Sequence, residues 1–281
     1  MSKKTAILTD STAYIPDELL AELDIHTIPL IINWDDNTYL DNVDITPDIF
    51  FDRLVQEKNL PTTSQPSAGA FKERYEELAK DYDGIVAILI SSGISGTVAS
   101  AQAAAEMVDF PVEVVDSKLA AMSAGLMVLA AARTAKAGGP MEEIVATAKS
   151  LVDKVKVMFV VDTLEFLHKG GRIGGAKRLV GSLLSMKPIL HLVDGKIDAL
   201  DSVRTKKKAV QTMVSIFEAD AVGKDKIHLA VFHSTAEDEA NKLMEQIKET
   251  HHLETAIVAG LSPVIGVHTG PGTIALTYYF D

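Results

Sequence analysis

Short apolar runs alternate with helical segments through the first half of the chain. Residues 5–9, 85–90 and 112–115 are rich in aliphatic and β-branched side chains, which is typical of strands buried in a parallel sheet. Apolar residues at helical spacing and alanine-rich segments predict helices before, between and after them, over residues 17–23, 46–56, 71–82, 98–107, 118–137 and 140–155. Alternating strands and helices predict an α/β fold, with a parallel sheet flanked by helices.

Two segments of this half depart from the simple alternation. Residues 24–33 predict a further strand, in which Pro29 indicates an edge position or a bend. Residues 59–67 contain two prolines and four hydroxyl side chains, which predicts a loop.

The second half has a different pattern, and its clearest signal is a hairpin. Residues 187–193 and 196–203 flank Asp194-Gly195, a pair that favours a type I′ turn between antiparallel strands. Further strands are predicted over residues 157–161, 227–232, 255–258 and 273–280. Helical segments are predicted over residues 163–169, 176–184, 205–220 and 236–251, with a loop over 260–272. We therefore predict two domains: an α/β domain over residues 1–155, and an α+β domain with a largely antiparallel sheet over residues 156–281.

The composition limits the classes of protein to which this chain can belong. A chain of 281 residues has room for two domains or one large one. It contains no cysteine, which excludes disulfides, thiolate metal sites and cysteine nucleophiles and fits a reducing compartment. The first residues lack the apolar region of a signal peptide. The longest uncharged apolar stretch, residues 119–132, is too short for a membrane span and predicts a buried helix. We expect a cytoplasmic protein.

Charge is unevenly distributed along the chain. The net charge of −12 argues against nucleic-acid binding. Residues 169–208, however, carry 10 Lys and Arg against 3 Asp and Glu, a local balance of +7. Such a basic block indicates a local anionic partner, a phosphate or an acidic protein surface; the alternative is an ordinary solvated surface.

A loop of small hydroxyl residues and glycines, residues 91–97, separates the strand at 85–90 from the helix at 98–107. Such a loop can hold an anion, because glycine admits a ligand to the backbone and the first helical N–H groups lack partners. The alternative is an ordinary turn in which serine caps the helix. Asp10-Ser11 and Asp116-Ser117 follow two other predicted strands, so all three exits should share one edge of the sheet. We interpret these four residues as shaping the loops, and the edge as the site of an anion or polar headgroup.

Seven short motifs occur along the chain in the order found in one protein family. They are TDST at 9–12, PTTSQPS at 61–67, SSGISGT at 91–97, LHKGGRI at 167–173, KPIL at 187–190, VR at 203–204 and IGVHTGPGT at 265–273. Together they resemble the DegV family of bacterial proteins, over nearly the whole chain. The resemblance implies a protein that binds a long-chain fatty acid between two domains and presents it to a partner fatty acid kinase. It also leaves room for peripheral contact with a membrane during lipid exchange.

The resemblance also implies roles for particular residues. The hydroxyls of Thr63 and Ser95 would hold the fatty acid carboxylate, and His268 would join this network. Arg172 and Arg204 would contact the acyl phosphate or the kinase. No cofactor or metal is implied beyond the bound fatty acid, and no catalysis by the chain itself.

An enzyme is the alternative that the residues leave open. It would be a serine hydrolase using Ser95 and His268, or a small-molecule kinase of related fold. The chain contains neither the G-x-S-x-G motif of hydrolases nor the G-x-x-x-x-G-K-[ST] loop of nucleotide-binding kinases, which favours the binding protein.

Overall fold

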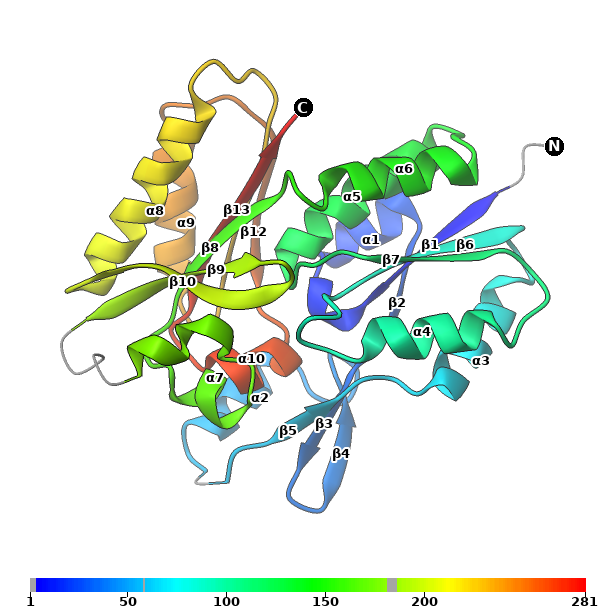
Figure 1. Ribbon diagram of the computed structural model, residues 1–281, viewed down its shortest axis with the longest axis horizontal. Coiled ribbons are helices and arrows are strands. Elements are labelled where there is room, and N and C mark those ends of the chain that lie inside the picture. The colour runs from blue at the N-terminus through cyan, green and yellow to red at the C-terminus, as the bar shows by residue number, and fades with distance from the viewer. Residues whose placement is uncertain (1–3, 58, 181–185) are drawn as a thin grey trace.

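Two large sheets and one small sheet organise the fold. The structure is a computed structural model that describes residues 4–57, 59–180 and 186–281 (Figure 1). The first large sheet has the order β2-β1-β6-β7, and all its neighbouring strands are parallel. Its strands are β1 (Thr5–Asp10), β2 (Ile25–Ile28), β6 (Gly84–Leu89) and β7 (Val112–Asp116). The predicted parallel sheet is confirmed.

Helices cover both faces of this sheet and bury its central strands, β1 and β6, on both sides. One face packs on α3 (Ala68–Leu78) and α4 (Thr97–Ala105). The other face packs on α1 (Asp17–Leu23), α5 (Met122–Lys136) and α6 (Met141–Leu151). Continuous apolar strands between two helical layers are the arrangement that the apolar runs predicted.

The second large sheet has the order β10-β9-β8-β13-β11-β12, and only its β11–β12 pair is parallel. Its strands are β8 (Lys156–Val160), β9 (Lys187–Val193), β10 (Lys196–Val203), β11 (Ile227–His233), β12 (Leu253–Gly260) and β13 (Ile274–Phe280). Asp194 and Gly195 have φ angles of 48° and 77°, as a type I′ turn requires. The hairpin and the largely antiparallel sheet are confirmed.

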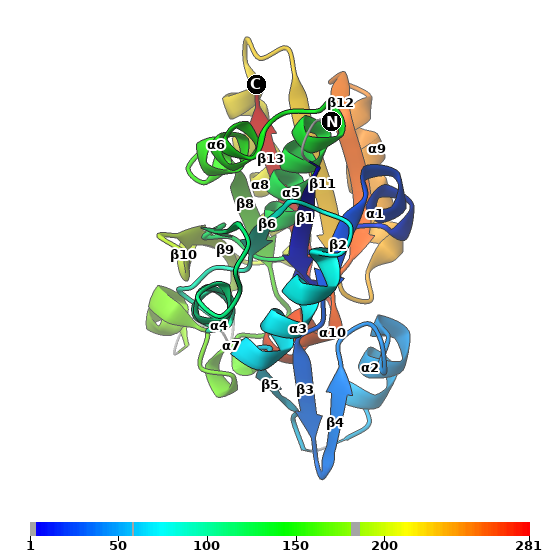
Figure 2. The ribbon, with the colours of Figure 1, turned by 90° about the vertical axis from the view of Figure 1, so that its right-hand side faces the viewer.

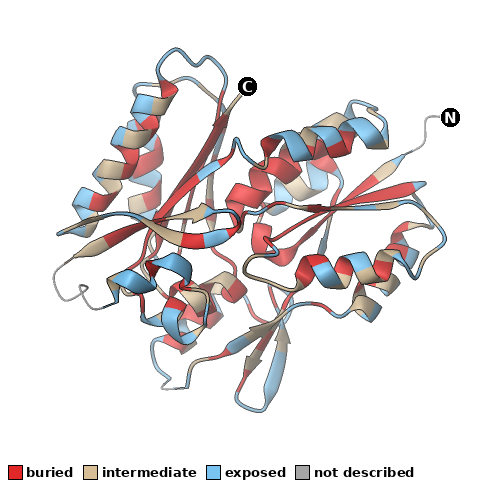
Figure 3. Ribbon diagram, in the orientation of Figure 1, coloured by how far each residue is buried: buried red, intermediate tan, exposed pale blue. Residues whose placement is uncertain are grey.

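Helix α5 lies between the two large sheets. Helices α8 (Lys206–Ala221) and α9 (Glu237–Lys248) cover one face of the six-stranded sheet. The other face brings Phe159 and Phe232 into the same apolar core as Met127 of α5. Most of α5 is buried (Figure 3). The buried helix predicted from residues 119–132 is therefore confirmed. Because both sheets share this core, the domain boundary at residue 155 stays a prediction.

A small lobe projects beyond the parallel sheet (Figure 2). Trp34 and Phe50 of the lobe share a core with Val264 and Val267 of α10 (Pro263–Thr269), so a C-terminal helix packs on an N-terminal lobe. The elements of this region are β3 (Ile31–Trp34), β4 (Asn37–Leu40), β5 (Thr62–Ser64), α2 (Pro47–Leu54), α7 (Glu165–Lys169) and α10 (Pro263–Thr269).

Three predictions of secondary structure need correction. The strand predicted over 24–33 divides at Pro29 into β2 and β3, which belong to different sheets, because proline lacks the N–H that a continuing ladder needs. The loop predicted over 59–67 contains β5, which pairs with β3. The loop predicted over 260–272 contains α10, which Ser262 caps by accepting from the Ile265 N–H, 3.3 Å away.

A fourth prediction is confirmed only in part. The helix predicted over residues 176–184 is a short 3₁₀ helix, Gly174–Leu179, and residues 181–185 lie outside the described residues. Another 3₁₀ turn, Ser11–Ala13, follows β1. Of the helices that the structure describes, none has the length and apolar character needed to cross a membrane.

Candidate functional site

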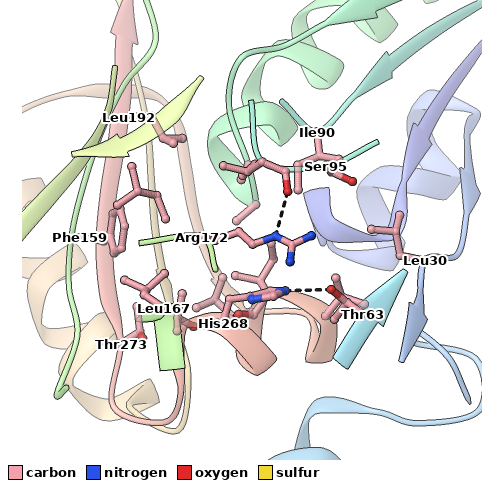
Figure 4. A pocket seen from close by; sticks show the side chains of 18 of the residues that line it. Leu30, Thr63, Ile90, Ser95, Phe159, Leu167, Arg172, Leu192, His268 and Thr273 are labelled. Carbon is pink, nitrogen blue, oxygen red and sulfur yellow. Dashed lines mark hydrogen bonds between the residues drawn. The ribbon is translucent and has the colours of Figure 1, made fainter. Parts of the chain in front are cut away.

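An apolar pocket lies where the parallel sheet, the antiparallel sheet and α10 meet (Figure 4). Its free volume is about 90 Å³. Both halves of the chain contribute to the wall, whose apolar side chains include Leu30, Ile90, Ile94, Val157, Phe159, Leu167, Leu192, Ile197, Phe232, Leu261, Val264 and Ile265.

Four of the five predicted site residues line this pocket: Thr63, Ser95, Arg172 and His268. The Thr63 Oγ1 and His268 Nε2 atoms are 2.8 Å apart, although 205 positions separate the two residues. The Arg172 Nε–H donates to the Ile94 carbonyl at 3.2 Å, and its Nη1–H donates to the Gly170 carbonyl at 2.8 Å. The structure therefore brings hydroxyl, imidazole and guanidinium groups together in a largely apolar wall, which Ser64, Gln65, Thr269 and Thr273 also line.

Ser95 lies in the loop between β6 and α4, directly before the helix. The N-cap position is occupied by Gly96, which has no side-chain capping hydrogen bond. The Ser95 hydroxyl lies 2.8 Å from the Thr97 hydroxyl and accepts from the Thr97 N–H at 3.3 Å. Gly96 rather than Ser95 therefore occupies the N-cap position, and the Ser95 hydroxyl lines the pocket.

His268 is held neutral by its surroundings. Burial, and then the nearby Arg172 charge, lower the pKa of His268 to about 4. Its Nε2 atom faces Thr63, and among the described residues its buried Nδ1 atom has no hydrogen-bond partner. A Cβ on Gly170 would lie 2.2 Å from that Nδ1, so only glycine at position 170 leaves room for this ring position.

Two buried carboxylates fix the segments that carry the site. Asp41 accepts from the Val264 N–H of α10 at 3.2 Å and from the Ser11 hydroxyl at 2.6 Å, and burial raises the pKa of Asp41 to about 6. Asp10 accepts from the Ile90 N–H at 2.7 Å, and burial raises its pKa as well. Asp41 was not predicted as a site residue, because nothing in its turn-rich segment shows that it meets α10.

The loops after β1, β6 and β7 do share one edge of the sheet, as predicted. Asp116 accepts from the Ser92 N–H at 3.1 Å and from the Lys118 N–H at 2.9 Å. Ser117 accepts from the Leu119 N–H at 3.1 Å. Together with the bonds of Asp10 and Ser11, these contacts confirm that the four residues shape the loops.

Arg204 lies elsewhere. It is exposed directly after β10 and does not line the apolar pocket. Within the described ranges no hydrogen bond or ion pair involves it. The structure therefore separates the two arginines that the sequence motifs placed in one role.

The geometry does not assemble the hydrolase that was left as an alternative. His268 is hydrogen-bonded to Thr63, and Ser95 to Thr97; no Ser95–His268 hydrogen bond exists in the part of the chain that the structure describes. In that same part, no group of three or more His, Asp or Glu side chains could hold a metal ion.

The parallel sheet and the largely antiparallel sheet thus enclose a largely apolar pocket with a few polar groups, which is the usual character of a small-molecule site. The chain belongs to the DegV family: it matches the family described as "Uncharacterised protein, DegV family" over residues 4–281. It is 36% identical to Protein DegV of Bacillus subtilis (strain 168) over 277 residues, which cover 98% of this chain and 99% of that protein.

Two solved structures support the same assignment. A DegV family protein from Thermus thermophilus, whose structure is described by its fatty acid binding, is 36% identical with a TM-score of 0.94, covering 99% of this chain and 100% of that one. DegV from Bacillus subtilis, described as a fatty acid binding protein, is 37% identical with a TM-score of 0.92, covering 100% of both chains. The resemblance seen in the motifs and the predicted fold class are confirmed.

Proposed function

We propose that this chain binds a long-chain fatty acid, with the acyl chain in the apolar pocket and the carboxylate at the polar end. One observation carries the proposal: Thr63, Ser95, Arg172 and His268 all lie in the wall of a largely apolar pocket. A site of this kind matches a ligand with one anionic group and a long apolar tail. The fatty acids bound by the two similar DegV proteins have that chemistry.

The acyl chain supplies most of the binding energy. Burying about 15 methylenes at roughly 0.8 kcal/mol each gives an upper limit near 12 kcal/mol before the entropic cost of association.

The polar end supplies donors for the carboxylate. Because His268 is neutral, only one of its ring nitrogens carries a proton. When Nε2–H donates to the Thr63 oxygen, the Thr63 hydroxyl is free to donate to the ligand. The Arg172 Nη2 group makes no hydrogen bond within the described residues, so it can donate to the same carboxylate.

We further infer that the chain presents this carboxylate to a partner fatty acid kinase and has no catalytic activity of its own. The basic block over residues 169–208 supports a contact with an anionic group or surface. Arg204 is suited to a partner contact, because its guanidinium is exposed and without a partner among the described residues.

The experiment is lipid extraction followed by rebinding. Mass spectrometry of the purified protein should find a fatty acid at about one per chain, and delipidated protein should take up palmitate saturably. A folded, delipidated sample that binds no long-chain fatty acid would exclude the proposed function. Incubation with an acyl ester, or with ATP alone, separates the enzyme alternative, because turnover by the isolated chain would favour it.

A further inference from the structure

A second cavity adjoins the apolar pocket on the side away from Thr63. This far cavity has a volume of about 380 Å³ and lies against the start of β8, the end of β9 and residues 118–119. Val157 and Leu192 line both the pocket and the far cavity, so their side chains form a wall between the two. Leu192 lies across the pocket from Thr63 (Figure 4). Among the described residues, the far cavity is lined by none of the polar site residues Thr63, Ser95, Arg172 and His268.

The wall stands at a gap in the six-stranded sheet. In the described part of the chain, β8 and β9 pair only over Met158–Val160 and Ile189–His191. Val157 and Leu192 are the next residues beyond the last pair, and each stays paired with the strand on its other side. Because no backbone ladder closes the sheet between them, the barrier at this point consists of the two side chains.

The surroundings change from apolar to charged across the wall. On the pocket side, Phe159 and Ile197 are buried neighbours in the lining. The far cavity is lined by five charged side chains, of which all but the last are exposed: Lys118, Asp153, Lys156, Asp194 and Asp220. An apolar group is therefore removed from water on the pocket side of the wall and stays close to water and charged groups beyond it.

We propose that Leu192 and Val157 set the length of the fatty acid that the chain binds best. The inference rests on the proposed function. A carboxylate among the polar site residues leaves the acyl chain to extend through the pocket toward the wall. Each methylene buried before the wall raises the affinity about fourfold, whereas a methylene beyond it gains little burial. The affinity should therefore rise with chain length up to the wall and then stop rising.

The test offers delipidated protein an excess of an equimolar mixture of laurate, myristate, palmitate, stearate and arachidate, and native mass spectrometry identifies the bound acid. Leu192→Ala makes room for about two further methylenes, so the ratio of the next longer acid to the acid that wild type prefers should rise about tenfold. Val157→Ala should shift the preference in the same direction. Leu192→Phe thickens the wall and should shift it to shorter acids.

Leu200 is the matched control, because it lines the far cavity but not the pocket. Leu200→Ala should leave the ratio within about twofold of wild type. A wild-type length preference in both Leu192 variants would overturn the proposal, as would an equal shift in Leu200→Ala. An equal loss of all the acids would also overturn it, because Leu192 would then support the fold and not select the length. If wild-type protein takes up none of the acids, it is the proposed function that fails.

Discussion

The surroundings of Arg172 and Arg204 differ in almost every physical respect. Arg172 is half-buried, two backbone carbonyls fix its guanidinium, and it lies in a pocket wall with Thr63, Ser95 and His268. Arg204 is exposed beyond the end of β10, and within the described residues its side chain makes no hydrogen bond or ion pair.

The difference shows how one residue type within a single basic block can serve two purposes. A fixed and partly desolvated guanidinium can bind a carboxylate strongly, because little side-chain entropy is lost and the local dielectric constant is low. An exposed and unconstrained guanidinium interacts weakly with a small ligand but is available to a partner protein. We therefore propose that Arg172 contributes to fatty acid affinity and that Arg204 contacts the partner.

The largest expected effect is that of Arg172→Ala. Removing one member of a desolvated, hydrogen-bonded charge pair costs about 2–5 kcal/mol, so the dissociation constant for palmitate should rise roughly thirtyfold or more. Isothermal titration of delipidated protein with palmitate measures this dissociation constant. Arg172→Lys should rescue only in part, because an ammonium group lacks the planar pair of donors. An Arg172→Ala protein with wild-type affinity would remove the distinction between the two arginines.

Loss of a hydroxyl should have the next largest effect. Ser95→Ala and Thr63→Val each remove a donor to a charged ligand, worth about 1.5–3 kcal/mol, so affinity should fall roughly ten- to 150-fold. Circular dichroism would check that both variants are folded. Unchanged affinity in both variants would place the carboxylate away from the polar end.

A smaller effect concerns stability and pH. Folding lowers the pKa of His268 from 6.5 to about 4, so between these pH values the unfolded chain binds more protons at this residue than the folded chain does. The free energy of unfolding should therefore rise with pH through this window, by up to about 1.4 kcal/mol per pH unit from this group, and the contribution should be complete above pH 6.5. Urea unfolding of the ligand-free His268→Gln variant should show a shallower slope than wild type; equal slopes would mean that His268 is not buried as a neutral ring.

The smallest effect on affinity should come from Arg204→Ala. Palmitate binding should stay within about twofold of wild type, because an exposed and unpaired charge contributes little. Formation of acyl phosphate by the partner kinase and ATP should nevertheless fall, even at saturating lipid. If palmitate affinity fell as far as in Arg172→Ala, Arg204 would belong to the headgroup site.

The elements with a strong local pattern could be predicted from the sequence. A run of β-branched residues predicts the strand at 85–90, and the turn residues Asp194-Gly195 predict the hairpin. Both signals depend only on neighbouring residues in the sequence. Helix α10 was missed because glycines and a histidine suggested a loop. The signal that could have found it was Ser262 followed by Pro263, a frequent start of a helix.

The polar site residues could be named from motifs, but their grouping could not. Arg172 and Arg204 both lie in the basic block, and only the tertiary structure places one of them beside Ser95 and His268. The apolar pocket has no sequence signal of its own, because its residues Phe159 and Phe232 lie in apolar runs like those of any core strand. The need for glycine at position 170 follows only from the structure, in which a Cβ there would collide with the ring of His268.

The central claim is that the ligand carboxylate lies between Thr63, Ser95 and Arg172. The most direct measurement is the ¹³C NMR signal of palmitate labelled at the carboxyl carbon and bound to the delipidated protein. The account predicts one bound resonance that differs from free palmitate and stays ionised to a lower pH, because a guanidinium and hydroxyl donors favour the anion. Arg172→Ala should shift this resonance and Arg204→Ala should not. A bound resonance that titrates as a water-exposed carboxyl does, and that neither substitution changes, would contradict the account.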